Sequence, residues 1–515
     1  IAALASEAQK YFSSLMGPDG VTPLKIVAVR RGGGFSGGGV VLLDEGVFRR
    51  PKTDSQTAVV LSDAVAKIWL GNAARVSGDG YGVIREGLPR FLATEFIESR
   101  FGKDVADIER LRQRVAYGTV SRRDGTVTQI SPLDDFYFTS MTNKGATIWR
   151  KLALDVGRDR LFKVLRSKIE SGTVDLSGIR DALPEQKPFL DYAFDQVTDG
   201  NFLIGIPRRE GNVSKVALRN TGPLAQTVKV AARTEAGETL SAFTTVEPKS
   251  FSEVVFESTS PVVVAEVDPE KLQLQADYSD DVAPRQFSEN DLVLLVKSSF
   301  DKQDFAAAER DARAVLAAFP RFDDVRVLLA RTLLAAGRTN EAEAQYRILQ
   351  DEKLPSSRTI AWTYAGLGDI ANQNSKPADA SANYIDAILA DADLGATIAA
   401  RRGSAKLTSK IPDASLKEFF GRFDRAVLSN NKAEVDALIL SGEMVRFSKG
   451  IAGQAQEWTS TILQTIELSS EYVSVEIGLA IRLLNKNSES GSAVMRLVKI
   501  DGSWKILSID SFEVR

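Results

Sequence analysis

The pattern of apolar and polar residues changes to strict alternation between about residue 201 and residue 280. The alternation is clearest at residues 213–218, 226–232 and 262–267, and turn residues separate these runs at Asn220–Gly222 and Ala236–Gly237. A period of two places every second side chain on the same face of a β-strand. Residues 199–283 are therefore predicted to form a small antiparallel β-sandwich, followed by a linker over residues 278–290.

Before this region, apolar residues recur mainly at helical spacing. One short apolar run, residues 24–29, predicts a strand, and longer runs predict helices at residues 57–71, 87–100 and 143–155. We expect residues 1–198 to form an α-rich domain with a small sheet.

After residue 287 the strand signals stop and a helical repeat begins. The pattern of a helix start followed three residues later by alanine occurs at Phe305/Ala308, Thr339/Ala342 and Pro377/Ala380, with spacings of 34 and 38 residues. The first spacing is that of tetratricopeptide repeats, in which each helical pair buries its apolar face against a neighbour. Residues 287–410 resemble about three such repeats, the last with a four-residue insertion. Trp362 and Tyr364 are interpreted as packing residues, with a concave peptide-binding groove as the alternative.

The last hundred residues combine helices with long alternating strands. An amphipathic helix at residues 416–426 and a shorter one at 435–440 precede a strand at 473–483 and a hairpin at Asp501-Gly502. This order resembles the cone-shaped domain of nuclear transport factor-like proteins, which implies that residues 411–515 form an α+β domain. Phe420, Phe447 and Trp504 are interpreted as core residues, with a ligand pocket as the alternative.

Composition excludes several kinds of chemistry. The chain has 515 residues with no histidine and no cysteine, so imidazole and thiolate are missing as metal ligands, bases and nucleophiles. A net charge of −3 gives no electrostatic surface for nucleic acid, and no apolar run reaches the roughly 20 residues that span a bilayer. The first residue is isoleucine, with no leader pattern, so we expect a processed product or a fragment. The absence of cysteine slightly favours a periplasmic or extracellular location.

One stretch nevertheless has the frame of a zinc site. Residues 59–72 read VVLSDAVAKIWLGN, and residues 84–88 read IREGL. They resemble the gluzincin aminopeptidases, the family of aminopeptidase N, which have H-E-x-x-H-x-W-x-G-N and, eighteen residues later, N-E-G. The ligand and base positions of that motif fall on Asp63, Ala64 and Lys67, and the third ligand falls on Glu86. The ammonium group of Lys67 cannot bind zinc, and the methyl group of Ala64 cannot act as a general base.

Two further family motifs are altered. The substrate-binding G-x-M-E-N strand corresponds to Gly33, Gly34, Phe35 and Ser36, so that the glutamate that grips the substrate amine is replaced by Ser36. The oxyanion-stabilising tyrosine of Tyr-x-Lys-Gly-Ala corresponds to Thr142. The resemblance implies a thermolysin-like fold over about residues 1–183 that has lost catalysis and needs no cofactor.

These replacements predict a specific contact. Asp63 and Lys67 are four residues apart and share a helix face, and the family fold would bring Glu86 to them. We expect the Lys67 ammonium to lie in the metal position and to neutralise both carboxylates, which would be costly to bury without it.

The sequence as a whole predicts a multidomain α+β protein: a thermolysin-like α-rich domain, an antiparallel β-sandwich, a tetratricopeptide solenoid and a cone-shaped α+β domain. We expect a catalytically inactive scaffold that binds a peptide or protein through the peptidase-like cleft or the repeats. The alternative is a hydrolase of the metallo-aminopeptidase family with carboxylate metal ligands, which Lys67 would oppose.

Other motifs have simpler readings. Residues 32–39 contain both G-x-G-x-x-G and G-x-S-x-G, but residues 40–43 predict a strand where both motifs require a helix. Asp134 and Asp135 are interpreted as surface or capping residues instead of paired glycosidase acids.

Overall fold

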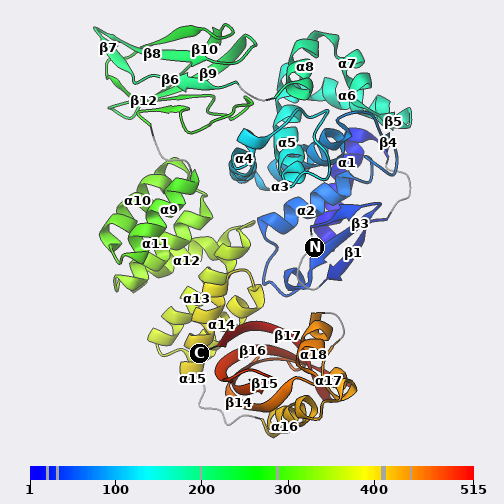
Figure 1. Cartoon of the computed structure of the whole chain (residues 1–515). Helices are drawn as coiled ribbons and strands as arrows, with labels where there is room; N and C mark the ends of the chain where they lie inside the picture. The colour runs from blue at the N-terminus through cyan, green and yellow to red at the C-terminus, as the bar shows by residue number, and fades with distance from the viewer. Residues whose placement is uncertain are drawn as a thin grey trace. The chain divides into compact units, whose positions relative to one another are not determined.

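Helices dominate the first 195 residues of the computed structural model, which describes residues 1–18, 23–29, 34–197, 200–285, 289–407, 413–440 and 443–514. The helices of this part are α1 (Ala2–Met16), α2 (Ser55–Ala66), α3 (Leu88–Phe101), α4 (Lys103–Gly118), α5 (Tyr137–Val156), α6 (Arg158–Glu170), α7 (Leu176–Ala182) and α8 (Lys187–Asp195). Short turns of helix are η1 (Glu45–Phe48), η2 (Val83–Gly87), η3 (Ser121–Arg123) and η4 (Pro184–Gln186). They appear in blue to cyan in Figure 1.

A small sheet accompanies these helices, as predicted. Its strands run in the order β1 (Lys25–Val29), β3 (Val40–Asp44) and β2 (Ser36–Gly37), with β1 parallel and β2 antiparallel to β3. The glycine-rich segment before β3 therefore leads into a strand, which confirms that neither helix-requiring motif is formed. A second pair of short strands joins β4 (Arg75–Val76) to β5 (Thr173–Val174).

The predicted helix at residues 57–71 ends earlier than expected. Helix α2 stops at Ala66, because the backbone tightens there: Ile68 N–H donates to Val65 O and Trp69 N–H donates to Ala66 O, both at 3.1 Å. The tight turn places the Trp69 ring in the core, where its Nε1 donates to Gly17 O at 2.9 Å.

Eight strands between residues 202 and 283 form two antiparallel layers, which confirms the predicted β-sandwich. They are β6 (Phe202–Ile204), β7 (Arg208–Glu210), β8 (Val213–Asn220), β9 (Gln226–Thr234), β10 (Thr239–Val246), β11 (Phe251–Glu257), β12 (Val262–Val267) and β13 (Val282–Ala283). One sheet has the order β10-β9-β12-β13 and the other β11-β8-β6, with β7 also on β8. Strand β13 corrects the predicted linker over 278–290, because Val267 N–H binds Asp281 O and draws this segment into the sheet; residues 286–288 of that linker lie outside the described residues.

All regular structure in the described part of the repeat region is helical. The helices are α9 (Glu289–Asp301), α10 (Phe305–Ala318), α11 (Asp323–Ala335), α12 (Thr339–Asp351), α13 (Ser357–Gln373), α14 (Pro377–Ala390) and α15 (Leu394–Leu407). Phe305, Thr339 and Pro377 each begin a helix, and Ala308, Ala342 and Ala380 are completely buried. The sequence phase of the repeat is therefore confirmed.

The last part of the chain packs helices against a four-stranded meander. Helices α16 (Ala414–Leu428), α17 (Lys432–Ala437) and α18 (Glu443–Ile451) precede β14 (Ala455–Glu467), β15 (Tyr472–Leu483), β16 (Ser488–Ile500) and β17 (Ser503–Val514), which pair in chain order. The predicted helix at 435–440 is wrong at its end, because Leu440 N–H binds Ile506 O beside the sheet. Phe420 is buried, and Phe447 and Trp504 pack against the same core.

The chain forms two compact units, residues 1–360 and 361–515, and the division falls inside α13. Among the helices of the described ranges, none is both long and apolar enough to cross a membrane.

Candidate functional site

Lys67 is held between two carboxylates at the end of α2. Its Nζ lies 3.0 Å from Asp63 Oδ1 and 2.7 Å from Glu86 Oε2, and only about a tenth of the lysine side chain is exposed. The predicted contact of Lys67 with both carboxylates is thus confirmed. We call Asp63, Lys67, Glu86 and Ser36 the Lys67 cluster.

Local structure explains how the two carboxylates meet. Asp63 is on the last turn of α2, whose first turn is capped by Asp54 through Thr57 N–H at 2.9 Å. Glu86 lies in η2, a π-helical turn that runs directly into α3. Such turns are rare and contain an extra residue, which changes the direction of the side chains that follow. The wider turn leaves Glu86 aimed at the end of α2.

Burial and charge act in opposite directions on these groups. Burial alone would lower the pKa of Lys67, but Asp63 and Glu86 outweigh it, and the net effect is a raised pKa. Burial raises the pKa of Glu86, while Lys67 pulls it down only in part. One ammonium group shared by two carboxylates therefore stays charged, and it leaves Glu86 easier to protonate than a glutamate in water.

Ser36 joins the cluster from the small sheet. Lys67 Nζ donates to Ser36 Oγ at 3.2 Å, and Ser36 Oγ donates to Asp63 Oδ1 at 3.5 Å. Of the other proposed substrate-binding residues, Phe35 is 66% exposed, Gly34 donates its N–H to Leu42 O, and Gly33 lies outside the described residues. Among the described members of this set, the structure brings only Ser36 to Lys67.

The remaining motif positions are on α2 and α5. Ala64 of α2 is buried in the core, and Thr142 is a partly buried residue of α5. Lys144, two residues after Thr142, points into the interior, where its Nζ lies 2.7 Å from Asp124 Oδ2. That ion pair is fully buried, and Asp124 also accepts hydrogen bonds from Ser140 and Tyr117.

Two neighbours of the cluster were not predicted from the sequence. Arg90 Nε lies 3.7 Å from Asp63 Oδ2, so Asp63 contacts two cations. Tyr137 is within electrostatic range of Glu86: burial and a hydrogen bond with Tyr81 raise the pKa of Tyr137, and the charge of Glu86 adds to this. Arg90 follows Glu86 by four residues, a spacing that could have indicated it, whereas the position of Tyr137 depends on how α5 packs.

The cluster does not fit a zinc ion. A zinc site needs ligands with free lone pairs, and here the carboxylates of Asp63 and Glu86 are already bound to an ammonium group, which has none. Within the described part of the chain, no three acidic side chains are grouped so that they could hold a metal ion. The arrangement is chemically a fixed ion-pair network.

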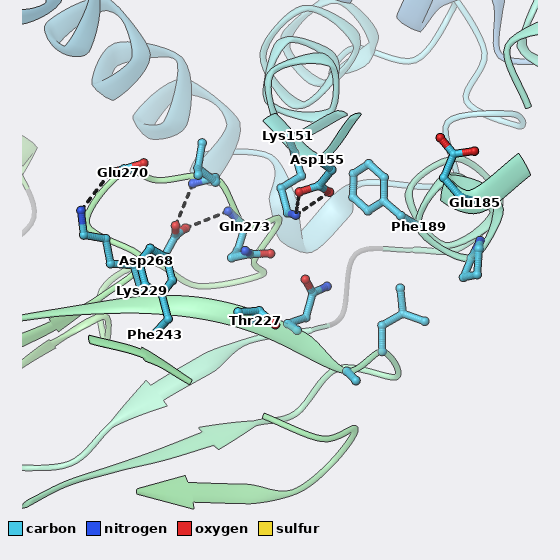
Figure 2. A pocket seen from close by; sticks show the side chains of 15 residues that line it. Lys151, Asp155, Glu185, Phe189, Thr227, Lys229, Phe243, Asp268, Glu270 and Gln273 are labelled. Carbon is cyan, nitrogen blue, oxygen red and sulfur yellow. Dashed lines mark hydrogen bonds and ion pairs between the residues drawn. The ribbon is translucent and has the colours of Figure 1, made fainter. Parts of the chain in front are cut away.

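A cavity of about 640 Å³ lies between the helices and the β-sandwich. Figure 2 shows Lys151, Asp155 and Phe189 on the helical side, facing Thr227, Lys229 and Phe243 on the sheet. Lys151 Nζ lies 2.5 and 2.6 Å from the two Asp155 oxygens, and Lys229 Nζ lies 3.1 Å from Glu270 Oε1. The volume is in the range of sites for small molecules.

The acidic pair considered as glycosidase residues is a surface feature. Asp135 is exposed and pairs with Arg123, and Asp134 accepts the backbone N–H of Ser131. This confirms the interpretation as surface residues, whereas the capping alternative is wrong, because the residue before α5 is Phe136 and no side chain caps that helix.

Comparison with known families identifies one region. Residues 299–356 match the tetratricopeptide repeat family model, which covers α10, α11 and α12 and agrees with the repeat seen in the sequence. No curated protein matches the chain.

Proposed function

We propose that this chain is a protein-binding or scaffolding protein whose first domain is an aminopeptidase-like fold without metal-dependent catalysis. The observation that carries the proposal is the Lys67 ammonium, within 3.0 Å of both Asp63 and Glu86. An ammonium group there supplies the positive charge that a metal would supply, but it cannot polarise a water molecule or a carbonyl oxygen as a Lewis acid does. The charge of the two carboxylates is therefore still neutralised, but metal-dependent catalysis is lost.

The repeats support the binding half of the proposal. Tetratricopeptide helices stack into surfaces that commonly receive peptides or proteins, and residues 299–356 match that family. In the first domain, exposed Phe35 lies next to Ser36 of the Lys67 cluster and would be available to a peptide ligand. We expect a peptide to contact Gly34, Phe35 and Ser36, while the repeats hold a protein partner.

The experiment that tests the loss of catalysis restores the missing residues. The triple variant Asp63→His, Ala64→Glu, Lys67→His would recreate two imidazole ligands and a base beside Glu86. After equilibration with zinc and extensive dialysis, we expect about one zinc per chain in the triple variant and none in the wild type. Adding Glu86→Gln to the triple variant should release the zinc.

Two results would contradict the proposal. Zinc, manganese or magnesium retained by the wild type, together with turnover of leucyl-4-nitroanilide that disappears in Glu86→Gln, would establish the alternative metallopeptidase. Failure of a folded triple variant to bind zinc would show that the register of the motif is wrong and that the aminopeptidase resemblance does not hold.

A further inference from the structure

Hydrogen bonds join the helical domain to one wall of the cavity shown in Figure 2, the segment that follows β12. Arg150 of α5 donates from Nη1 to Glu270 O at 2.8 Å, and Ser121 Oγ donates to Ala276 O at 3.1 Å. The two sides of the cavity are therefore fixed to each other by contacts within the chain. A cavity of about 640 Å³ that is formed in this way has the size and the rigidity of a small-molecule site.

The charged side chains of this cavity are already neutralised. All six charged residues of the described lining have partners: Lys151 pairs with Asp155, Lys229 with Glu270 and Glu185 with Arg160, and two backbone N–H groups bind Asp268. An ion that entered the cavity would lose part of its hydration and would meet no free charge of the opposite sign. The lining therefore favours an uncharged ligand.

Gln273 brings a carboxamide without a partner to the cavity (Figure 2). Only 5% of this residue is exposed, yet within the described ranges no hydrogen bond reaches its side-chain oxygen or nitrogen. Its backbone N–H, by contrast, donates to Asp268 at 2.7 Å. A carboxamide has both donors and an acceptor, and a buried one is stabilised when these groups are bound. An amide group of a ligand supplies the complementary acceptor and donor.

Apolar side chains make up much of the remaining lining. The larger ones come from both walls of the cavity and are Pro188, Phe189, Leu224, Phe243 and Leu272. Aromatic rings gain both burial and ring contacts against phenylalanine. The lining therefore combines apolar surface for a ring with a carboxamide for a neutral polar group.

We propose that this cavity binds an uncharged small molecule that joins an aromatic ring to an amide group. The amide would exchange hydrogen bonds with Gln273, and the ring would lie against Phe189 and Phe243. This site is separate from the Lys67 cluster and from the matched repeats, so it stands or fails independently of the function proposed above.

Three probes of nearly the same shape test the choice of charge. At pH 7 benzamide is neutral, benzoate is an anion and benzamidine is a cation, while all three join a phenyl ring to a planar head group. We expect saturable binding of benzamide to the full chain in saturation-transfer NMR, with a Kd on the order of 1 mM because the probe is small. Benzoate and benzamidine should bind at least about tenfold more weakly.

Substitutions of Gln273 test where the amide binds. Gln273→Leu removes the carboxamide at similar size and should weaken benzamide binding about tenfold. Gln273→Glu places a free carboxylate in the cavity and should reverse the order, so that benzamidine becomes the tighter probe. Gln456→Leu is the control, because Gln456 is exposed and lies on β14, away from the lining, and it should bind benzamide like the wild type.

A matched pair of variants tests where the ring binds. Phe243 and Phe251 are both 71% exposed, but only Phe243 lines the cavity. Phe243→Ala should therefore weaken benzamide binding, and Phe251→Ala should not. Both remove an exposed ring, so their melting temperatures should match that of the wild type.

The comparison of probes uses the wild type and so does not depend on the folding of any variant. The proposal is overturned if benzamide fails to bind at about 10 mM, or if either ion binds as tightly as benzamide. It is also overturned if folded Gln273→Leu binds benzamide as the wild type does, or if Phe243→Ala and Phe251→Ala have equal effects.

Discussion

Gly87 and Gly145 touch each other where η2 crosses α5. A Cβ atom added to Gly87 would lie 2.7 Å from Gly145 Cα, and one added to Gly145 would lie 2.8 Å from Gly87 Cα. Each glycine directly follows a residue of a sequence motif, Glu86 in one case and Lys144 in the other. The contact sets the distance between the two segments and thereby the position of Glu86.

We expect Gly87→Ala or Gly145→Ala to destabilise the protein by about 2 kcal/mol or more, because the clash is with backbone atoms that cannot move aside. Thermal unfolding and urea unfolding would measure the change. Gly118→Ala is the control, since no atom lies within 4 Å of its added Cβ. Similar unfolding midpoints for all three variants would show that the two segments are farther apart than described.

Removal of the Lys67 charge should destabilise the protein, because its two carboxylate partners would then be buried without that cation. Lys67→Met leaves Asp63 and Glu86 in a largely buried site, and we expect a loss of about 3–5 kcal/mol at neutral pH. Since burial already raises the pKa of Glu86 with Lys67 beside it, the variant should raise it further. The folded variant then binds more protons than its unfolded form, so its stability should fall as the pH rises through that pKa.

The difference in unfolding free energy between the wild type and Lys67→Met should accordingly narrow as the pH falls toward 4. The double variant Lys67→Met/Glu86→Gln should recover much of the lost stability. Lys103→Met is a suitable control, because Lys103 forms an exposed pair with Asp107 that contributes at most about 1 kcal/mol. A difference in unfolding free energy between the wild type and Lys67→Met that does not change with pH would contradict the ion pair of Lys67 and Glu86.

Asp281 should make the stability of the β-sandwich depend on pH. It is almost fully buried, and burial raises its pKa to about 7 although Lys271 pulls it down. Between about pH 4 and pH 7 the folded chain holds a proton that the unfolded chain releases, so stability should decrease as the pH rises across this range. Asp281→Asn should remove that decrease and be the more stable form at pH 8, by a few kcal/mol at most. Melting temperatures from pH 5 to 8 would measure this, and Asp135→Asn at the exposed surface should leave the profile unchanged.

The repeats contain a turn position with left-handed backbone. Gln303, Gly337 and Ser375 each stand two residues before a helix start, with φ of 62°, 77° and 56°. Glycine adopts this conformation without strain, whereas residues with a Cβ atom are sterically strained in it. We expect Gly337→Ala to lose about 1 kcal/mol and Gln303→Gly or Ser375→Gly to gain up to about 1 kcal/mol. Chemical unfolding would detect either sign, and a gain from Gly337→Ala would contradict the shared turn geometry.

Local features of this protein were determined by the sequence alone. The helix starts at Phe305, Thr339 and Pro377, the alternating strands of the sandwich and the Asp501-Gly502 hairpin all follow from short-range periodicity and turn chemistry. The contact of Lys67 with Asp63 also belongs here, because a spacing of four residues on a helix is nearly sufficient to place it.

Tertiary structure decided whatever depends on packing between distant segments. The capture of residues 282–283 by the sheet, the approach of Tyr137 to the Lys67 cluster, and the cavity between the helices and the β-sandwich are of this kind. None has a short-range signature, because each results from contacts between residues far apart in the chain, whose geometry is set only when the core is assembled.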